Sequence, residues 1–211
     1  MPQKYNTKPK YWEDAKRFLV KKDPVLSQII QRVGNKDFLT RNSTPFQTLS
    51  NAIIGQQISV AAAASISQKL KNKIGSISPL KINTTSKVTM RNTGLSRQKI
   101  EYLKLLASCF INKPHFFYKL HEQSDDDVIM KLCELKGIGE WTAQMYLIFQ
   151  LNRPNILPMA DIGFLNGVIK VYKLKKNNTS KIIEIANNWG TYKTVAVWFI
   201  WRVLDPDIVQ Y

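Results

Sequence analysis

Residues that can cap a helix are followed again and again in this sequence by apolar residues at helical spacing. This pattern favours a fold of packed helices over other fold classes. Residues 43–59 read STPFQTLSNAIIGQQIS, in which Ser43 or Thr44 can cap a helix that carries an apolar stripe. A glycine interrupts that stripe, and Ser59 can cap a second helix over residues 59–74. Two helices meeting at GQQIS are therefore expected.

The same pattern continues along most of the chain. Further helices are expected over residues 23–33, where Asp23 can cap the first turn, and over residues 124–137, 140–151, 161–172, 180–189 and 192–204. Residues 86–112 predict a short helix, a break at Gly94 and a longer helix capped by Ser96. No run alternates between apolar and polar residues for long enough to predict a strand. The sequence therefore predicts an all-α protein whose helices are joined mostly by short connections.

Charge points to a polyanionic partner. The 211 residues include 31 Lys and Arg against 15 Asp and Glu, giving a formal net charge of +16. On a chain with 44% hydrophobic residues, enough for the core of one or two domains, such an excess favours nucleic acid as the partner. A solvated basic surface is the alternative explanation.

Several classes of protein are disfavoured by the same composition. Two cysteines, Cys109 and Cys133, are too few for a disulfide scaffold or a four-cysteine metal cluster. The longest apolar run, residues 195–201, is too short to span a bilayer, and the N-terminus lacks the apolar core of a secretory signal. We expect a soluble intracellular protein with no membrane partner.

The stretch LKGIGEWTA, residues 135–143, predicts a tight hairpin between two helices. Gly137 and Gly139 would let backbone amides approach a ligand closely, and the start of the second helix favours a phosphate. Such a grip holds a nucleic-acid backbone without reading its sequence. An ordinary interhelical turn is the alternative for this motif taken alone.

Together with LPMADIGF at residues 157–164, this hairpin resembles the signature of the helix–hairpin–helix/GPD DNA glycosylase superfamily. Three further stretches match that family in the same order: residues 45–66, 94–107 and 189–201. The resemblance is greatest to the DNA-3-methyladenine glycosylase II group in its compact form. It implies two helical subdomains with the active-site cleft between them.

The resemblance also implies a domain organisation. It begins at about Asp23, so residues 1–22 are expected to be an N-terminal extension and residues 23–211 the glycosylase domain. Within that domain the hairpin is expected at residues 124–151 and the catalytic segment at residues 157–172.

By this resemblance Asp161 is the catalytic residue. Breaking a base–sugar bond builds positive charge on the sugar, which a nearby carboxylate stabilises while it positions or activates water. An aspartate directly before a helix is also a common N-cap, and the two roles are compatible.

The base pocket is expected to be aromatic. Relatives that cleave the DNA strand carry a nucleophilic lysine where this chain has Trp141, so the resemblance implies a monofunctional, hydrolytic enzyme. Trp141 and Trp189 would form the pocket walls, with Met145 and Tyr192 as further lining residues. An aromatic face suits the cationic ring of an alkylated purine.

Contacts to DNA are expected at the hairpin and at the strand-opening corner. Gln56 and Gln57 match that corner, with Gln57 as the wedge that fills the gap left by the flipped base; a polar helix end is the alternative. The expected hairpin contacts are Lys136, Gly137, Ile138, Gly139 and Thr142. Charge alone suggests further phosphate contacts at Arg97, Lys99 and Arg153.

No cofactor is expected to be required. The family pattern places a structural Na⁺ or K⁺ at the backbone carbonyls of Cys133, Leu135 and Ile138. The expected partner is double-stranded DNA with a damaged base, bound by a monomer. The expected location is the cytoplasm and nucleoid, or the nucleus in a eukaryote.

Two other functions remain open from the sequence. One is a glycosylase for deaminated bases such as hypoxanthine. The other is a non-enzymatic helix–hairpin–helix DNA-binding protein, which Asp161 argues against because a carboxylate beside a DNA backbone repels phosphate.

Overall fold

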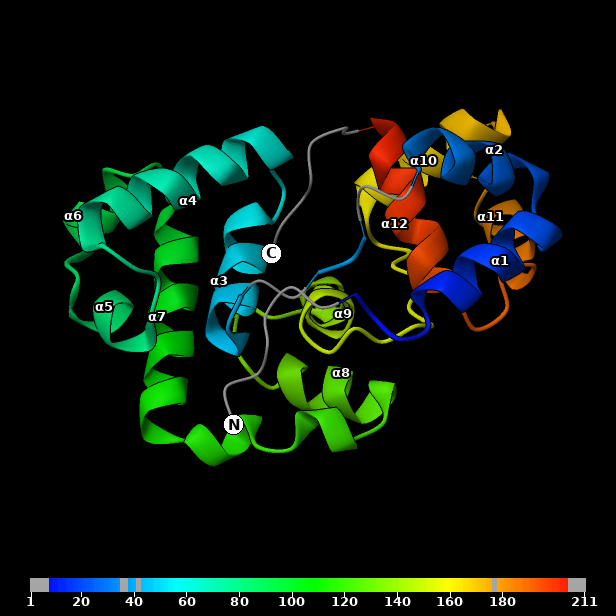
Figure 1. Cartoon of the computed structure of the whole chain (residues 1–211). Coiled ribbons are helices and arrows are strands. Elements are labelled where there is room, and N and C mark those ends of the chain that lie inside the picture. Colours follow the sequence, from blue (N-terminus) through cyan, green and yellow to red (C-terminus); the bar gives the residue numbers. More distant parts are fainter. Residues whose placement is uncertain (1–7, 35–37, 41–42, 176–177, 205–211) are drawn as a thin grey trace. The chain divides into compact units, whose positions relative to one another are not determined.

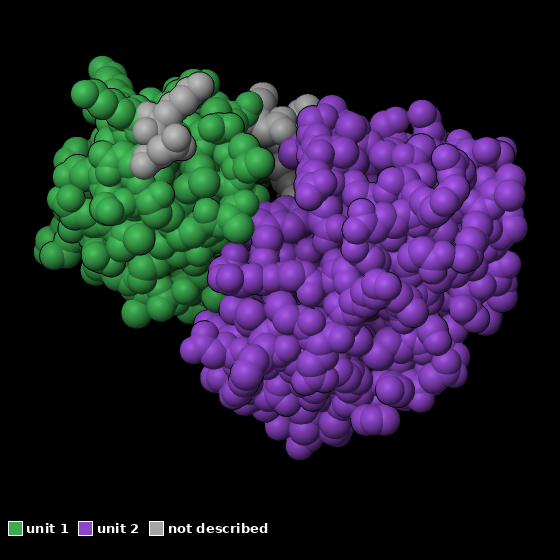
Figure 2. All heavy atoms as spheres, turned by 180° about the vertical axis from the view of Figure 1, so that it is seen from behind, with its two compact units in different colours: residues 1–42, 152–210 green, residues 43–151, 211 purple. Residues whose placement is uncertain are grey.

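The computed structural model describes residues 8–34, 38–40, 43–175 and 178–204, whose regular elements are all helices, with no strand among them. The all-α prediction is therefore confirmed. The chain divides into two compact units (Figure 2). Unit 1 comprises residues 1–42 and 152–210, and unit 2 comprises residues 43–151.

Unit 1 is built around the last helix that the structure describes. Its helices are α1 (Trp12–Lys22), α2 (Pro24–Val33), α10 (Ile162–Tyr172), α11 (Thr179–Asn187) and α12 (Lys193–Leu204). Helix α12 packs against α1, α2 and α10, as Figure 1 shows, and it is buried from Thr194 to Arg202. Most of α12 is therefore core, which explains its nearly continuous apolar sequence.

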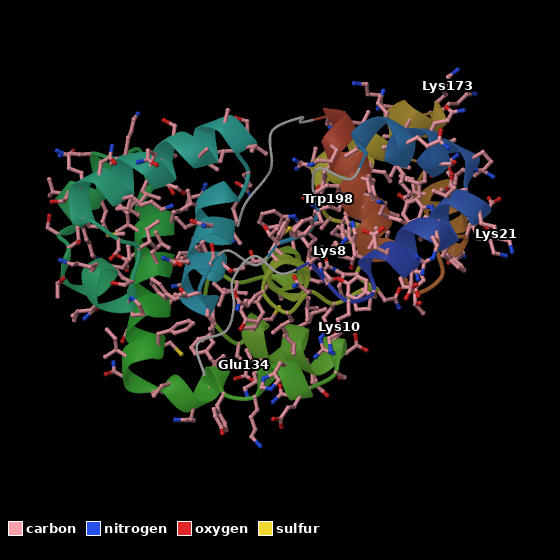
Figure 3. The ribbon with its side chains drawn as sticks, viewed as in Figure 1. Lys8, Lys10, Lys21, Glu134, Lys173 and Trp198 are labelled. Carbon is pink, nitrogen blue, oxygen red and sulfur yellow. The ribbon has the colours of Figure 1, made fainter. Side chains whose placement is uncertain are left out.

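Helix α1 corrects the expected domain boundary. Residues 1–22 were expected to be an extension, yet residues 12–22 form a helix that packs into unit 1. Trp12 is only 1% exposed and lies edge-on to Trp198 of α12, with ring centroids 5.1 Å apart (Figure 3 labels Trp198). Part of the predicted extension thus contributes to the core.

Unit 2 holds the two helices of the predicted hairpin. Its elements are α3 (Pro45–Gly55), α4 (Val60–Ile74), α5 (Pro79–Thr84), α6 (Lys87–Arg91), α7 (Arg97–Asn112), η1 (Pro114–Phe117), η2 (Leu120–Glu122), α8 (Asp125–Cys133) and α9 (Glu140–Phe149). Helix α3 packs against α4, α7 and α9, and α8 packs against α9. Every residue of α9 from Thr142 to Phe149 is buried. Among the described helices of both units, none is long and apolar enough to cross a membrane.

The helix caps follow the sequence closely. Asp23, Thr44, Ser59 and Ser96 each accept hydrogen bonds from first-turn amides, as their positions predicted. Thr44 also forms a reciprocal capping box with Gln47. These caps fix where α2, α3, α4 and α7 begin, and so they orient the loops that carry the candidate site.

Candidate active site and nucleic-acid interface

The predicted hairpin joins α8 to α9 in unit 2. Helix α8 ends at Cys133, four residues before Gly137, and the amide of Ile138 then donates to the carbonyl of Leu135 at 3.0 Å. Gly137 has a φ of 93°, which favours glycine. A Cβ atom at this position would lie 2.2 Å from Cγ of Tyr102, so the turn is pressed against that ring.

Helix α9 begins with its N-terminus uncapped. The other α-helices described in unit 2 each start at a Ser or Thr whose side chain accepts from the first turn, whereas α9 starts at Gly139 with no side-chain cap. The first amides of a helix have no partner within it. This end is therefore suited to accept an anion such as phosphate.

The two glutamines at the end of α3 have different roles. The side-chain amide of Gln56 donates to the carbonyl of Gly137 at 2.9 Å and to the hydroxyl of Thr142 at 3.0 Å. Gln57 is exposed and has a left-handed φ of 58°. Gln56 thus ties α3 to the hairpin, whereas the side chain of Gln57 is at the surface.

Thr142 differs from expectation. It was expected to contact DNA, but its side chain is only 1% exposed and its hydroxyl accepts from Gln56. The Thr142 side chain therefore positions Gln56 within unit 2. Its backbone amide, in the first turn of α9, remains at the helix N-terminus.

A pocket of about 550 Å³ lies within unit 2 between the corner and the hairpin. Its lining residues come from the end of α3, the start of α7 and the hairpin turn: Gln56, Gln57, Ile58, Ser96, Gln98, Lys99, Tyr102, Gly137, Ile138 and Gly139. The structure therefore brings together the predicted corner and much of the predicted hairpin contact set.

Lys99 also differs from expectation. Charge suggested a phosphate contact, but its ammonium donates to the carbonyls of Ile54 at 2.6 Å and Gln56 at 2.7 Å. Burial lowers the pKa of Lys99. The Lys99 side chain thus binds backbone carbonyls within unit 2. Of the other expected phosphate contacts, Lys136 and Arg97 are exposed, and Arg153, in unit 1, is partly exposed.

In unit 1, Asp161 caps α10 and remains partly exposed. Its Oδ1 accepts from the amide of Phe164 at 2.5 Å and from the indole nitrogen of Trp201 at 3.1 Å. Together these two hydrogen bonds fix the direction of the carboxylate. Trp201 was not singled out from the sequence, because the apolar run that contains it indicates only a core helix.

Trp189 is a core residue, which corrects its expected role as a pocket wall. Its side chain is fully buried, and its indole nitrogen donates to Oδ2 of Asp23 at 2.9 Å. The ring lies edge-on to Phe164, and Tyr172 donates to the same Asp23 oxygen at 2.6 Å. Trp189 and Asp23 therefore belong to a buried polar cluster of unit 1.

The other expected pocket residues have different exposures. Met145 is fully buried in α9, so its side chain is core and the expected lining role is not met. Trp141, in the first turn of α9, is partly exposed. Tyr192, directly before α12, is also partly exposed and lies edge-on to Phe18. Trp141 and Tyr192 are thus the aromatic candidates that a ligand could reach.

Side chains in the described ranges form no group of three or more His, Cys, Asp or Glu that could hold a metal ion. The expected cation ligands are backbone carbonyls instead. Cys133 is the last residue of α8, so its carbonyl has no partner within the helix. The Leu135 carbonyl accepts the Ile138 amide and keeps a second lone pair. These donors are chemically suited to a monovalent cation.

Comparisons with known proteins agree on one family. Residues 51–190 match the family model described as HhH-GPD superfamily base excision DNA repair protein. The chain is 29% identical over 182 residues to DNA-3-methyladenine glycosylase 1 of Schizosaccharomyces pombe, a match covering 83% of this chain and 80% of the relative. It is 29% identical over 227 residues to the DNA-3-methyladenine glycosylase of Saccharomyces cerevisiae, covering 100% of this chain and 77% of the relative. A solved structure of the Schizosaccharomyces pombe 3-methyladenine DNA glycosylase in complex with abasic DNA has a TM-score of 0.80 and 28% identity, covering 90% of this chain and 95% of that chain.

Proposed function

The chain belongs to the HhH-GPD superfamily of base excision DNA repair proteins, and from this premise we propose that it excises alkylated purines, of the 3-methyladenine and 7-methylguanine type, from duplex DNA. It hydrolyses the N-glycosyl bond, as the names of its relatives imply for them. It acts as a monomer on double-stranded DNA that carries a damaged base, in the nucleoid or the nucleus. Its product is an abasic site, which later repair steps process.

The orientation of Asp161 is the observation that carries this proposal. Two donors, the Phe164 amide and the Trp201 indole, hold one carboxylate oxygen at a helix N-terminus while the side chain stays partly exposed. A nucleotide turned out of the duplex places its sugar beside this carboxylate. The negative charge stabilises the cation that forms as the base leaves, and the carboxylate positions the attacking water.

The leaving group explains the choice of substrate. Methylation at N3 or N7 makes a purine cationic, so it departs without a strong general acid. Trp141, in unit 2, and Tyr192, in unit 1, each have a partly exposed ring. An aromatic face attracts such a cation with a contribution of about 0.5–2 kcal/mol.

The proposed enzyme is monofunctional. Cleaving the strand through a covalent intermediate needs a nucleophilic amine, and Trp141 occupies the position at which strand-cleaving relatives carry a lysine.

The hairpin supplies the grip on the DNA backbone. The uncapped start of α9 and the exposed Gly139 present amides to a phosphate, and Lys136 adds a positive charge. We extend the proposal to a Na⁺ or K⁺ ion held by the carbonyls of Cys133, Leu135 and Ile138. When bound, such an ion would add positive charge next to the phosphate; no other cofactor is proposed.

Base release is the direct test. Duplexes with a single 7-methylguanine, hypoxanthine or uracil are incubated with the wild-type protein and with Asp161→Asn. Asparagine keeps the N-cap of α10 but removes the charge. We expect release of the alkylated base by the wild type and a loss of at least about 100-fold in the variant, with unchanged binding to abasic DNA.

Three outcomes would contradict the proposal in different ways. Full excision by Asp161→Asn would remove Asp161 from catalysis. Preferential release of hypoxanthine would assign the enzyme to deaminated bases. Binding of every duplex without release of any base would leave a DNA-binding protein only.

A further inference from the structure

Lys99 joins the end of α3 to α7 through two short hydrogen bonds. Its ammonium lies 2.6 Å from the carbonyl of Ile54 and 2.7 Å from the carbonyl of Gln56. These carbonyls are at the C-terminus of α3, where helix carbonyls lack partners and the helix dipole attracts a cation. Lys99 therefore fixes the direction in which the chain leaves α3.

The next residue depends on that direction. Gln57 has a left-handed φ of 58°, a conformation that is unfavourable for residues other than glycine and needs support from its surroundings. Lys99 holds the carbonyl directly before Gln57, and the Gln56 side chain holds the hairpin at Gly137 and Thr142. Gln57 itself is exposed. Lys99 thus stabilises the backbone conformation from which the exposed side chain of Gln57 projects.

We propose that Lys99 is a positioning residue for DNA opening: it holds the α3 corner so that Gln57 enters the duplex at a fixed place relative to the hairpin. This inference rests on the proposed function. Lys99 touches neither the base nor the sugar in this role and acts through Gln57. Loss of the clamp lets the corner relax, so insertion of Gln57 becomes less effective while the hairpin still binds the backbone.

The same helix provides a matched control. Lys104 of α7 donates to the carbonyls of Asn83 at 2.8 Å and Thr85 at 2.5 Å, at the end of α5. Burial and the charge of Lys87 lower the pKa of Lys104, and burial lowers that of Lys99. Lys104 therefore makes the same kind of contact on a helix end that carries neither Gln57 nor the hairpin.

The experiment uses the full chain with Lys99→Met, Lys99→Arg and Lys104→Met, each in the wild-type and the Gln57→Ala background. Folding is checked by circular dichroism and thermal unfolding. Lys99→Gln, whose side chain is uncharged and one bond too short to bridge both carbonyls, is made in case Lys99→Met unfolds. Two readouts are taken. One is single-turnover release of 7-methylguanine, and the other is the fluorescence of 2-aminopurine beside an abasic-site analogue, which reports duplex opening without excision.

Lys99→Met is expected to lower both signals by about tenfold at saturating enzyme, because a small displacement of a positioned group has a large effect. Lys99→Arg should retain most of each signal, and Lys104→Met should change each by less than about twofold although its stability falls. In the Gln57→Ala background, Lys99→Met should lower each signal further by less than about twofold.

Wild-type signals in folded Lys99→Met would overturn the inference, as would an undiminished effect of this variant in the Gln57→Ala background. If Lys99→Met unfolds, wild-type signals in Lys99→Gln would do the same. Failure of the proposed function looks different, since the wild type would then release no base. The fluorescence comparison would still decide the role of Lys99 in that case.

Discussion

The ring of Tyr102 lies directly against the backbone of Gly137, so closely that a Cβ on Gly137 would be 2.2 Å from Cγ of the ring. Tyr102 is on α7, and its hydroxyl accepts a hydrogen bond from Gln98 at 2.5 Å. The Tyr102 side chain, held by Gln98, therefore packs directly against the hairpin turn. The glycine is needed here for space as well as for its positive φ of 93°.

Replacing Gly137 by alanine should destabilise unit 2. The new methyl group overlaps the Tyr102 ring, and alanine is unfavourable at this φ, so we expect the free energy of unfolding to fall by at least about 2 kcal/mol. Chemical denaturation measures this loss. Affinity for abasic DNA should fall as well, because the turn must shift to relieve the overlap.

Gly139→Ala is the matched control for Gly137→Ala. Gly139 has an extended φ of −103°, and a Cβ there would meet no described atom within 4 Å. We expect unchanged stability but weaker DNA binding, because the methyl group obstructs the approach of a phosphate to the α9 amides. Equal loss of stability in both variants would show that the Tyr102 contact is unimportant.

The hairpin and the helix caps were predictable because their signals are local. Thr44, Ser59 and Ser96 each lie within three residues of the amide that they cap. The residues flanking LKGIGEWTA indicated two helices joined by a short turn, and the structure has them. The ends of both helices were misplaced by a few residues: α8 was expected to end at Gly137 and ends at Cys133, and α9 was expected to end at residue 151 and ends at Phe149.

Contacts between distant segments were not predictable in this way. Trp12 packs on Trp198, and no local pattern connects them. Trp189 and Tyr192 are three residues apart, and the sequence does not say which one faces inward. The turn between α11 and α12 and the buried acceptor Asp23 decide that Trp189 does.

The buried cluster around Asp23 should contribute strongly to stability. Its carboxylate accepts from the amides of Val25 and Leu26, the hydroxyl of Tyr172 and the indole of Trp189. Asp23→Ala leaves these buried donors unpaired, so we expect a loss of about 3 kcal/mol or more in the free energy of unfolding.

The role of Trp189 as a core residue can be tested separately. Trp189→Phe removes one donor to Asp23 and should lower stability, with base excision by the folded enzyme unchanged within about twofold. Tyr192→Ala should lower excision instead. A reduced excision rate at unchanged stability in Trp189→Phe would instead show that Trp189 contributes to the base pocket.

Alkaline pH should weaken the fold through Tyr172. Burial, and then the hydrogen bond and charge of Asp23, raise the pKa of Tyr172 well above its ordinary value of 10. Below pH 10 the hydroxyl is neutral in both states. Above pH 10 the unfolded chain loses this proton while the folded chain keeps it, so stability falls by about 1.4 kcal/mol per pH unit for this group.

Tyr172→Phe should therefore reduce the loss of stability above pH 10 by about 1.4 kcal/mol per pH unit, the contribution of one proton. Denaturation curves from pH 8 to pH 11 measure the slope. Burial also raises the pKa of Tyr11, whose hydroxyl donates to the carbonyl of Asn152. Tyr11→Phe should produce a similar flattening, and an unchanged slope in both variants would contradict the shifts.

The hydrogen bond from Trp201 to Asp161 should affect catalysis more than binding. Trp201→Phe removes the indole donor 3.1 Å from Oδ1, while the Phe164 amide still holds the same oxygen. With this restraint lost, the carboxylate is less well oriented toward the sugar. We expect single-turnover excision to fall roughly tenfold, with unchanged affinity for abasic DNA.

Trp198→Phe provides the control for Trp201→Phe. Trp198 is also on α12, but its ring packs against Trp12 and Phe199. This variant should lose stability and keep its excision rate. In the Asp161→Asn background, Trp201→Phe should have no further effect on excision, because the charge that it orients is already absent. A tenfold loss that persisted in that background would mean that Trp201 acts on the substrate directly.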